Sequence, residues 1–116
     1  MTPLQADGSE QILIKGCIEN DRLIQKRLYD RYKRAMYTIC YRMLGNEDDA
    51  HDALQEGFIN VFKYISSYSG KGTLGSWIKT IIVRSAIKQL KINTAKNTIG
   101  IDALESFDVI EWPVNI

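Results

Sequence analysis

Apolar residues recur at every third or fourth position along most of the chain between residues 9 and 91. This spacing is typical of amphipathic α-helices, whose apolar side returns about every 3.6 residues. Either Asn20 or Asp21 can cap the second helix, and Gly45 suits the residue that follows it. The pattern predicts four helices, over about residues 9–19, 21–44, 47–64 and 73–91.

The apolar positions of these helices are expected to meet in one core. The run 81–83 alone would fit a strand, but the helical spacing around it outweighs that interpretation. The prediction is an all-α fold, a compact antiparallel bundle of three long helices plus a short N-terminal helix. The residues expected to face its core are Ile12, Leu13, Cys17, Ile24, Leu28, Tyr32, Ala35, Met36, Ile39, Cys40, Met43, Ala50, Leu54, Gly57, Phe58, Val61, Ile65, Leu74, Trp77, Ile78, Ile81, Ile82 and Ile87.

The helical spacing is interrupted once and then ends. Serine and glycine residues at 66–72 predict a loop before the last helix. Beyond residue 93 the pattern dissolves, and the charged residues from 98 onward are all acidic. We therefore expect a helical domain over residues 1–95, followed over residues 96–116 by an acidic tail or the start of an interdomain linker.

Composition narrows the class of protein. A chain of 116 residues with 45% hydrophobic and 25% charged residues fits one small domain. No apolar run approaches the roughly 20 residues of a membrane span, and no secretion signal opens the chain. Cys17 and Cys40 make no disulfide framework, and His51 has no ligand residues at metal spacing. We expect a cytoplasmic protein without membrane insertion, catalytic residues, cofactor or metal.

The net charge of +1 conceals two segments of opposite charge. Residues 47–56 carry five acids and no Lys or Arg, whereas residues 60–99 carry seven Lys or Arg and no acid. The basic segment also holds Tyr64, Tyr68 and Trp77. Cations suit phosphates and flat rings suit bases, so this segment has both components of a nucleic-acid surface.

Five polar residues of the third helix are spaced so that they share one side. Such a face could dock a basic partner surface, although composition alone favours a solvated helix face. The residues are Asp49, Asp52, Gln55, Glu56 and Asn60.

The loop and the last helix supply the candidate nucleic-acid contacts. Tyr68 lies in a polar loop next to Ser69 and Lys71, and we interpret it as the ring that stacks on a base. Trp77 occupies an inward position and is expected to be at least partly buried. A basic stripe on the last helix could be plain solvated surface, but the lack of acids in the segment favours a phosphate track, formed by Lys79 or Thr80 with Arg84, Lys88 and Lys91.

Four stretches of the chain together resemble region two of bacterial extracytoplasmic-function sigma factors. These are LYDRY (28–32), AHDALQEGF (50–58), FKYISSYSGKGTLGSWI (62–78) and IIVRSAIKQLK (81–91). The resemblance implies that the acidic-polar face docks on the clamp helices of the largest RNA polymerase subunit. It also implies that the loop and basic helix recognise and melt the minus-ten promoter element by capturing its non-template strand, with one base turned into a pocket at the loop.

The resemblance assigns the promoter contacts to residues of the loop and the last helix, which are Tyr64, Tyr68, Ser69, Lys71, Trp77, Lys79, Thr80, Arg84, Lys88 and Lys91. Arg84 and Lys88 stand where many family members have Asn and Asp, so base preference does not transfer at these positions. The helix-turn-helix domain of the family does not occur in these 116 residues. An anti-sigma factor is a further expected partner, and the alternative is a helical bundle that acts on the sigma/anti-sigma system without binding DNA.

Overall fold

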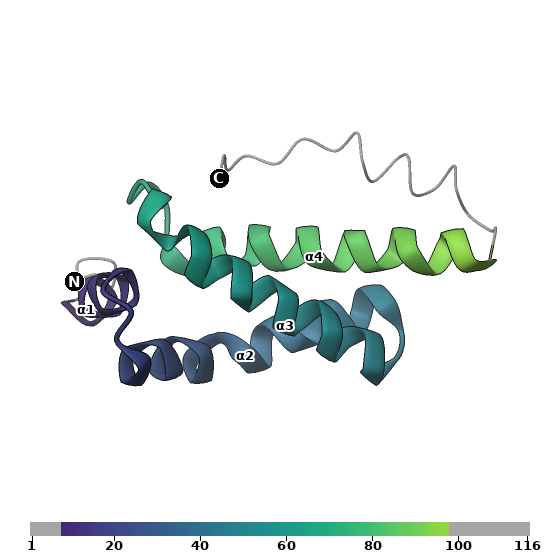
Figure 1. Ribbon diagram of the computed structural model, residues 1–116, viewed down its shortest axis with the longest axis horizontal. Coiled ribbons are helices and arrows are strands. Elements are labelled where there is room, and N and C mark those ends of the chain that lie inside the picture. Colours follow the sequence, from purple (N-terminus) through teal and green to yellow (C-terminus); the bar gives the residue numbers. More distant parts are fainter. Residues whose placement is uncertain (1–7, 98–116) are drawn as a thin grey trace.

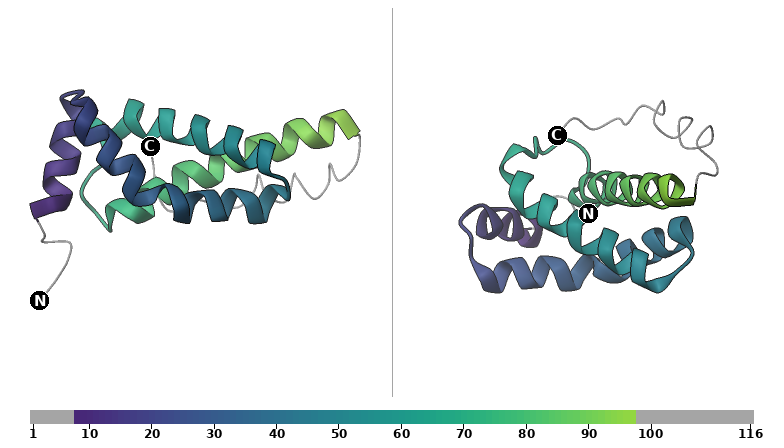
Figure 2. Two further views of the ribbon diagram at one scale, coloured as in Figure 1. Left: turned by 90° about the horizontal axis from the view of Figure 1, so that it is seen from below. Right: turned by 45° about the vertical axis from the view of Figure 1, so that its right-hand side comes forward.

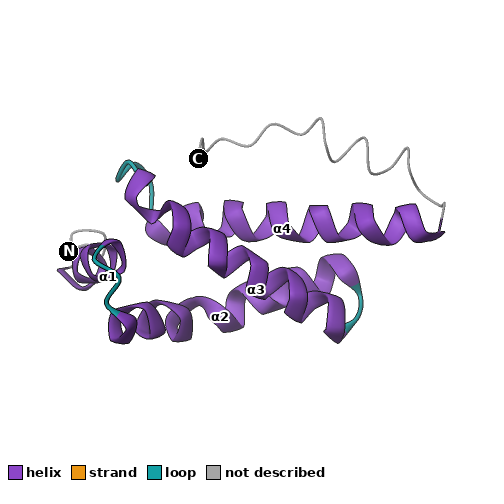
Figure 3. Cartoon of the chain, viewed as in Figure 1, coloured by secondary structure: helices purple, strands orange, loops and turns teal. Residues whose placement is uncertain are grey.

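The computed structural model describes residues 8–97, and the regular elements in that range are all helical (Figure 1, Figure 3). The predicted all-α fold is therefore confirmed. The acidic segment from residue 98 onward lies outside the described residues. The elements are α1 (Gly8–Ile18), α2 (Arg22–Leu44), α3 (Glu47–Tyr64), the short 3-10 helix η2 (Ile65–Ser67) and α4 (Leu74–Asn97).

The three long helices lie alongside one another, and α1 packs across one end of them (Figure 1, Figure 2). α3 contacts both α2 and α4, which also contact each other. Successive long helices run in opposite directions, as their short connections require. α1 contacts α2 and η2, so it lies next to the segment that leads from α3 into the following loop.

Local side-chain hydrogen bonds fix the start of each long helix. The Asp21 carboxylate accepts from the backbone N–H groups of Leu23 and Ile24, so Asp21 is the cap of α2. The Asn46 side chain accepts from the Asp49 N–H at 2.8 Å and caps α3. The Thr73 hydroxyl accepts from the Ser76 N–H at 3.1 Å at the start of α4.

The core contains most of the predicted inward residues. Leu28, Cys40, Ala50, Val61 and Ile82 are fully buried, and they come from all three long helices. Two predicted inward residues are exposed, Ala35 and Ile12, the latter with 58% of its surface accessible. The side of α1 that is buried carries Leu13, Gly16 and Cys17, with Gly16 close to Ile24 of α2, and Ile12 lies off that side.

α4 departs most from the sequence prediction. It continues past Lys91 to Asn97, because Asn93 does not end the helix but donates from Nδ2 to Asp49 Oδ2 of α3 at 2.9 Å. Its N-terminal half is covered on nearly all sides, so even Thr80 and Ser85 are buried. The Thr80 hydroxyl donates to the Ser76 carbonyl, which satisfies it inside the helix.

None of the helices within residues 8–97 combines the length and apolar character that crossing a membrane demands.

Candidate nucleic-acid interface

The five polar residues of α3 that were predicted to form one docking face divide into two groups. Asp52 and Gln55 are exposed and point away from the bundle, as a docking face requires. Asp49 accepts hydrogen bonds from Asn46 and Asn93, and Glu56 pairs with Lys88 of α4. These two carboxylates therefore hold α3 against α4, and Asn60 lies with them on the side toward α4.

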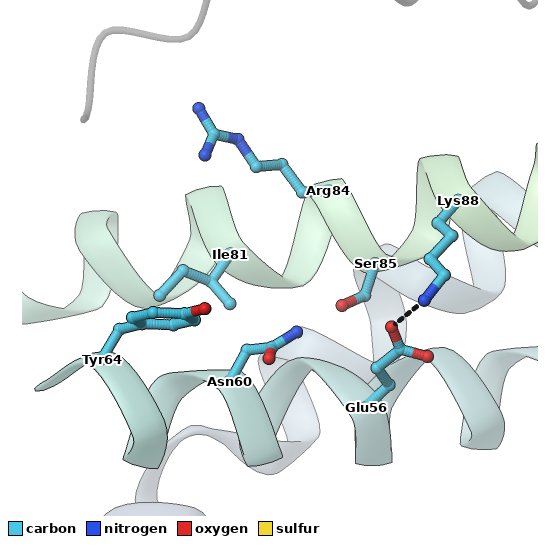
Figure 4. A pocket seen from close by; sticks show the side chains of 7 residues that line it. All are labelled: Glu56, Asn60, Tyr64, Ile81, Arg84, Ser85 and Lys88. Carbon is cyan, nitrogen blue, oxygen red and sulfur yellow. Dashed lines mark hydrogen bonds and ion pairs between the residues drawn. The ribbon is translucent and has the colours of Figure 1, made fainter. Parts of the chain in front are cut away.

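A groove of about 440 Å³ runs between α3 and α4 (Figure 4). In it, the predicted polar face and the predicted basic stripe meet. Lys88 reaches across the groove to Glu56, with 2.7 Å between Nζ and Oε2, whereas Arg84 points away from α3. The lining residues are Glu56, Asn60, Tyr64, Ile81, Arg84, Ser85 and Lys88.

The basic stripe of α4 is shorter than predicted. Arg84, Lys88 and Lys91 are exposed on one side of the helix. Lys79 is also exposed, but five residues of helix turn it about 140° away from Arg84. Thr80, the alternative member of the stripe, is buried and cannot contact a ligand without rearrangement.

The Lys88–Glu56 pair corrects the premise that no acid lies near the stripe. The partners are 32 residues apart in sequence. The segment around Lys88 contains no acid, so its sequence gave no sign of the pairing. Their side chains remain 63% and 44% exposed. Ion pairs this exposed contribute only about 0–1 kcal/mol, so an incoming phosphate can compete for Lys88 at low cost.

Tyr68 holds the loop in place through two contacts and also lines the pocket beside the loop. Its ring contacts Trp77, with 5.5 Å between the ring centroids and 49° between the planes. Its hydroxyl donates to the Gly72 carbonyl at 2.9 Å, across a turn in which Gly72 has a φ of 71°. Tyr68 is half-buried against the core, so only part of its ring is accessible for stacking on a base.

The other two candidate rings differ in accessibility. Trp77 is 3% exposed, which confirms its inward position, and it lies in contact with Tyr68 rather than with solvent. Tyr64 is 40% exposed at one end of the α3–α4 groove, and the Lys63 ammonium lies 5.4 Å from its ring centroid. Of the three rings, Tyr64 is therefore the one with the most surface available for stacking.

A second pocket, of about 480 Å³, lies between α1 and the loop. The loop contributes two predicted contacts, Tyr68 and Ser69, while Lys71 is exposed nearby and donates its backbone N–H to the Ser69 hydroxyl. α1 contributes residues that sequence reasoning missed, because no local pattern joins α1 to a loop some 55 positions later. The lining residues are Glu10, Gln11, Ile14, Tyr68, Ser69, Gly70, Gly72 and Thr73.

Glu10 and Tyr68 line the same pocket, so the carboxylate of Glu10 acts on the hydroxyl of Tyr68. Burial raises the pKa of the Tyr68 hydroxyl, and the negative charge of Glu10 raises it further. Glu10 acts in the same direction on the pKa of Tyr32, where burial is again the larger cause and Arg31 opposes it. The carboxylate of Glu10 therefore places a negative charge where the loop meets α1.

α2 carries a second concentration of positive charge that the sequence analysis overlooked. Within residues 22–44 there are seven Lys or Arg and one acid, Asp30, which pairs with Lys26 and Lys33. All seven cations are exposed, so cations are not confined to the segment 60–99. The signal was present in the composition of this helix. The seven residues are Arg22, Lys26, Arg27, Arg31, Lys33, Arg34 and Arg42.

His51 packs beside an aromatic ring. Its ring centroid lies 4.9 Å from that of Tyr37. Across the part of the chain that is described, no three or more His, Cys, Asp or Glu side chains converge in a way that could hold a metal ion.

Comparison with known families identifies the helical domain. The family described as Sigma-70 region 2 matches residues 28–95, which run from Leu28 in α2 through α3 to the last turn of α4. The chain belongs to the sigma-70 region 2 family. The resemblance drawn from the four sequence stretches is thereby confirmed.

Individual relatives agree with this assignment. The ECF RNA polymerase sigma factor SigW of Bacillus subtilis is 34% identical over 78 residues, which make up 67% of this chain and 42% of SigW. SigG of Mycobacterium tuberculosis is 32% identical over 60 residues, 52% of this chain and 16% of SigG. SigE of Mycolicibacterium smegmatis is 41% identical over 46 residues, 40% of this chain and 18% of SigE. The chain therefore spans less than half the length of these sigma factors.

Proposed function

We propose that this sigma-70 region 2 domain acts in transcription initiation as the part of an extracytoplasmic-function sigma factor that binds RNA polymerase core and captures the melted minus-ten element. The observation that carries the proposal is the α3–α4 groove. Tyr64, an exposed ring, and the cations Arg84 and Lys88 all line this groove, with Tyr64 toward one end and Lys88 toward the other (Figure 4). A ring and cations on one groove match a single strand, in which bases are free to stack and phosphates follow at short intervals.

On the DNA side, the non-template strand would follow α4 toward the loop. Arg84, Lys88 and Lys91 contact phosphates, with Lys88 exchanging Glu56 for a phosphate oxygen. Tyr64 offers a stacking surface, worth about 1–3 kcal/mol per base. Turning a base out of the duplex costs a few kcal/mol. One or two stacking contacts plus phosphate neutralisation offset that cost only when polymerase holds the DNA in place.

On the protein side, the exposed outer face of α3 would dock on the polymerase clamp helices. Asp52 and Gln55 lie there, and Ile59, one turn further along, is 65% exposed. A partner that covers Ile59 would remove its apolar surface from water, which favours binding. Asp49, Glu56 and Asn60 support this face from behind, since they lie toward α4.

The DNA half of the proposal predicts that the cations of α4 contribute more to single-strand affinity than the same number of cations elsewhere on the protein. Fluorescence anisotropy of labelled mixed-sequence single strands at low salt measures the affinity. Arg84→Ala with Lys91→Ala should weaken binding about tenfold and lower the slope of log K against log salt by about 0.7 per lost phosphate contact. The matched control is Arg27→Ala with Arg34→Ala, which removes two exposed cations from α2.

The control pair should change binding by less than about threefold at the same salt, since Arg27 and Arg34 lie on α2 and do not line the α3–α4 groove. Equal losses in the two double variants would mean unspecific attraction to any basic surface. No binding of single strands by any of these proteins, with or without polymerase core, would reject the DNA half. It would leave the alternative, a helical bundle that acts on sigma and anti-sigma proteins alone.

A further inference from the structure

The pocket between α1 and the loop differs chemically from the basic groove. Its walls combine the ring of Tyr68, the hydroxyls of Ser69 and Thr73, and two glycines that leave the backbone accessible. Its volume of about 480 Å³ is in the range of pockets that enclose a small organic group. The pocket lies at the loop, where the captured base is expected. One of its walls is formed by α1, which the sequence analysis did not include among the DNA-binding elements.

Glu10 decides the polarity of that wall. A carboxylate is a hydrogen-bond acceptor only, and no ion pair of Glu10 with a Lys or Arg occurs within residues 8–97. A negative charge in the pocket repels phosphate, so the pocket is unsuited to the DNA backbone. The group that it fits is flat, to lie against Tyr68, and carries an N–H donor at its edge.

We propose that Glu10 is a specificity-determining residue, which admits bases with an exocyclic amino group to the pocket and disfavours thymine. Adenine, cytosine and guanine each carry such an amine, and thymine has carbonyl oxygens in its place. A carboxylate accepts from the amine of the first three. In thymine the corresponding positions are carbonyl oxygens, whose lone pairs the carboxylate repels, and the one edge donor is the N3–H between them. This inference rests on the proposed capture of a base at the loop and adds the chemistry that selects it.

The Gln11 side chain lines the same wall without fixing the selection. An amide carries both a donor and an acceptor, so it can turn to suit either an amine or a carbonyl. The fixed acceptor is therefore Glu10, and the substitution that tests its role is Glu10→Gln. This change keeps the size of the side chain and replaces an acceptor by a group that accepts and donates.

The sharpest probes are oligodeoxycytidine and oligodeoxyuridine of about twelve nucleotides, a length within the usual site sizes of such proteins. The two pyrimidines differ at C4, where one has an amine and the other a carbonyl. The whole 116-residue chain should bind the cytidine strand about five- to tenfold more tightly by anisotropy. In Glu10→Gln the ratio of the two affinities should fall below about twofold.

The matched control is Glu19→Gln, which makes the same change at an exposed site near the other end of α1. It should keep the parental ratio, and circular dichroism should show all three proteins equally folded. A ratio that Glu10→Gln leaves unchanged, while both strands still bind, overturns this inference and leaves the proposed function standing. Failure of every protein to bind either strand, with or without polymerase core, overturns the DNA half of the proposed function and this inference with it.

Discussion

Two buried thiols are expected to make this domain less stable at alkaline pH. Cys17 and Cys40 are 1% and 0% exposed, and burial raises the pKa of each to about 11, with a smaller contribution from Asp21 at Cys17. The folded state therefore holds these protons more tightly than the unfolded state, whose thiols titrate near pH 9. The stability that this contributes is complete below pH 9 and is lost as the pH rises toward 11.

We predict a loss of about 1 kcal/mol per thiol between pH 7.5 and pH 10, which urea denaturation at the two pH values measures. Lysines and tyrosines also titrate in this range, so the test is a difference between proteins. Cys17→Ala with Cys40→Ala should be less stable at pH 7.5 and should show a clearly smaller drop on raising the pH. An equal drop in the double variant would assign the alkaline sensitivity to other groups.

α3 and α4 approach closely at Gly57. A Cβ placed there would lie 2.5 Å from Cδ1 and 3.3 Å from Cα of Ile82. We predict that Gly57→Ala lowers the free energy of unfolding by about 1–3 kcal/mol, because the cost of overpacking exceeds the gain of about 1 kcal/mol in helix propensity. Urea denaturation is the measurement. Gln55→Ala, at an exposed site of the same helix, should stay within about 0.5 kcal/mol of the parent.

A Gly57→Ala protein as stable as the parent would mean that α4 can move away freely. The groove beside Gly57 would then lack a fixed width, since the hydroxyl of Ser85, one of its lining residues, lies 3.4 Å from the position that the new methyl group would occupy.

Helices were predictable from this sequence because their signals are local. The spacing of apolar residues, the cap at Asp21 and the left-handed Gly45 each depend on neighbours within a few positions. The candidate site depends only in part on residues that are close in sequence. The Lys88–Glu56 pair and the α1 wall of the second pocket join residues far apart in sequence, so no window of the chain contains them.

The course of α4 was mispredicted for a related reason. Thr80 was predicted to belong to an exposed stripe, and the helix was predicted to end near Lys91, before Asn93. The structure instead buries Thr80 and pairs Asn93 with Asp49 of α3. Which side of a helix is covered depends on how many neighbours it has, and periodicity within the helix does not contain that information.

The whole molecule presents its two proposed binding surfaces on adjacent sides of one helix pair. The polymerase face uses the exposed side of α3, around Asp52 and Gln55, and the DNA surface uses α4 and the groove beyond Glu56. Glu56 and Lys88 join the two surfaces through a weak ion pair. On this proposal, a partner on the outer face of α3 would leave the stripe of α4 uncovered, so both partners would be able to bind together.

This arrangement predicts that binding to core RNA polymerase and binding to single-stranded DNA can be lost separately. Asp52→Ala with Gln55→Ala should weaken binding to core RNA polymerase at least fivefold and leave single-strand affinity within about twofold, because neither side chain reaches the groove. Arg84→Ala with Lys91→Ala should do the reverse. Core polymerase from Bacillus subtilis, the source of the relative SigW, is the probe, and binding is measured by anisotropy of labelled domain. If each double variant lost both activities while remaining folded, polymerase and DNA would share one surface, and docking on α3 would have to cover the cations of α4.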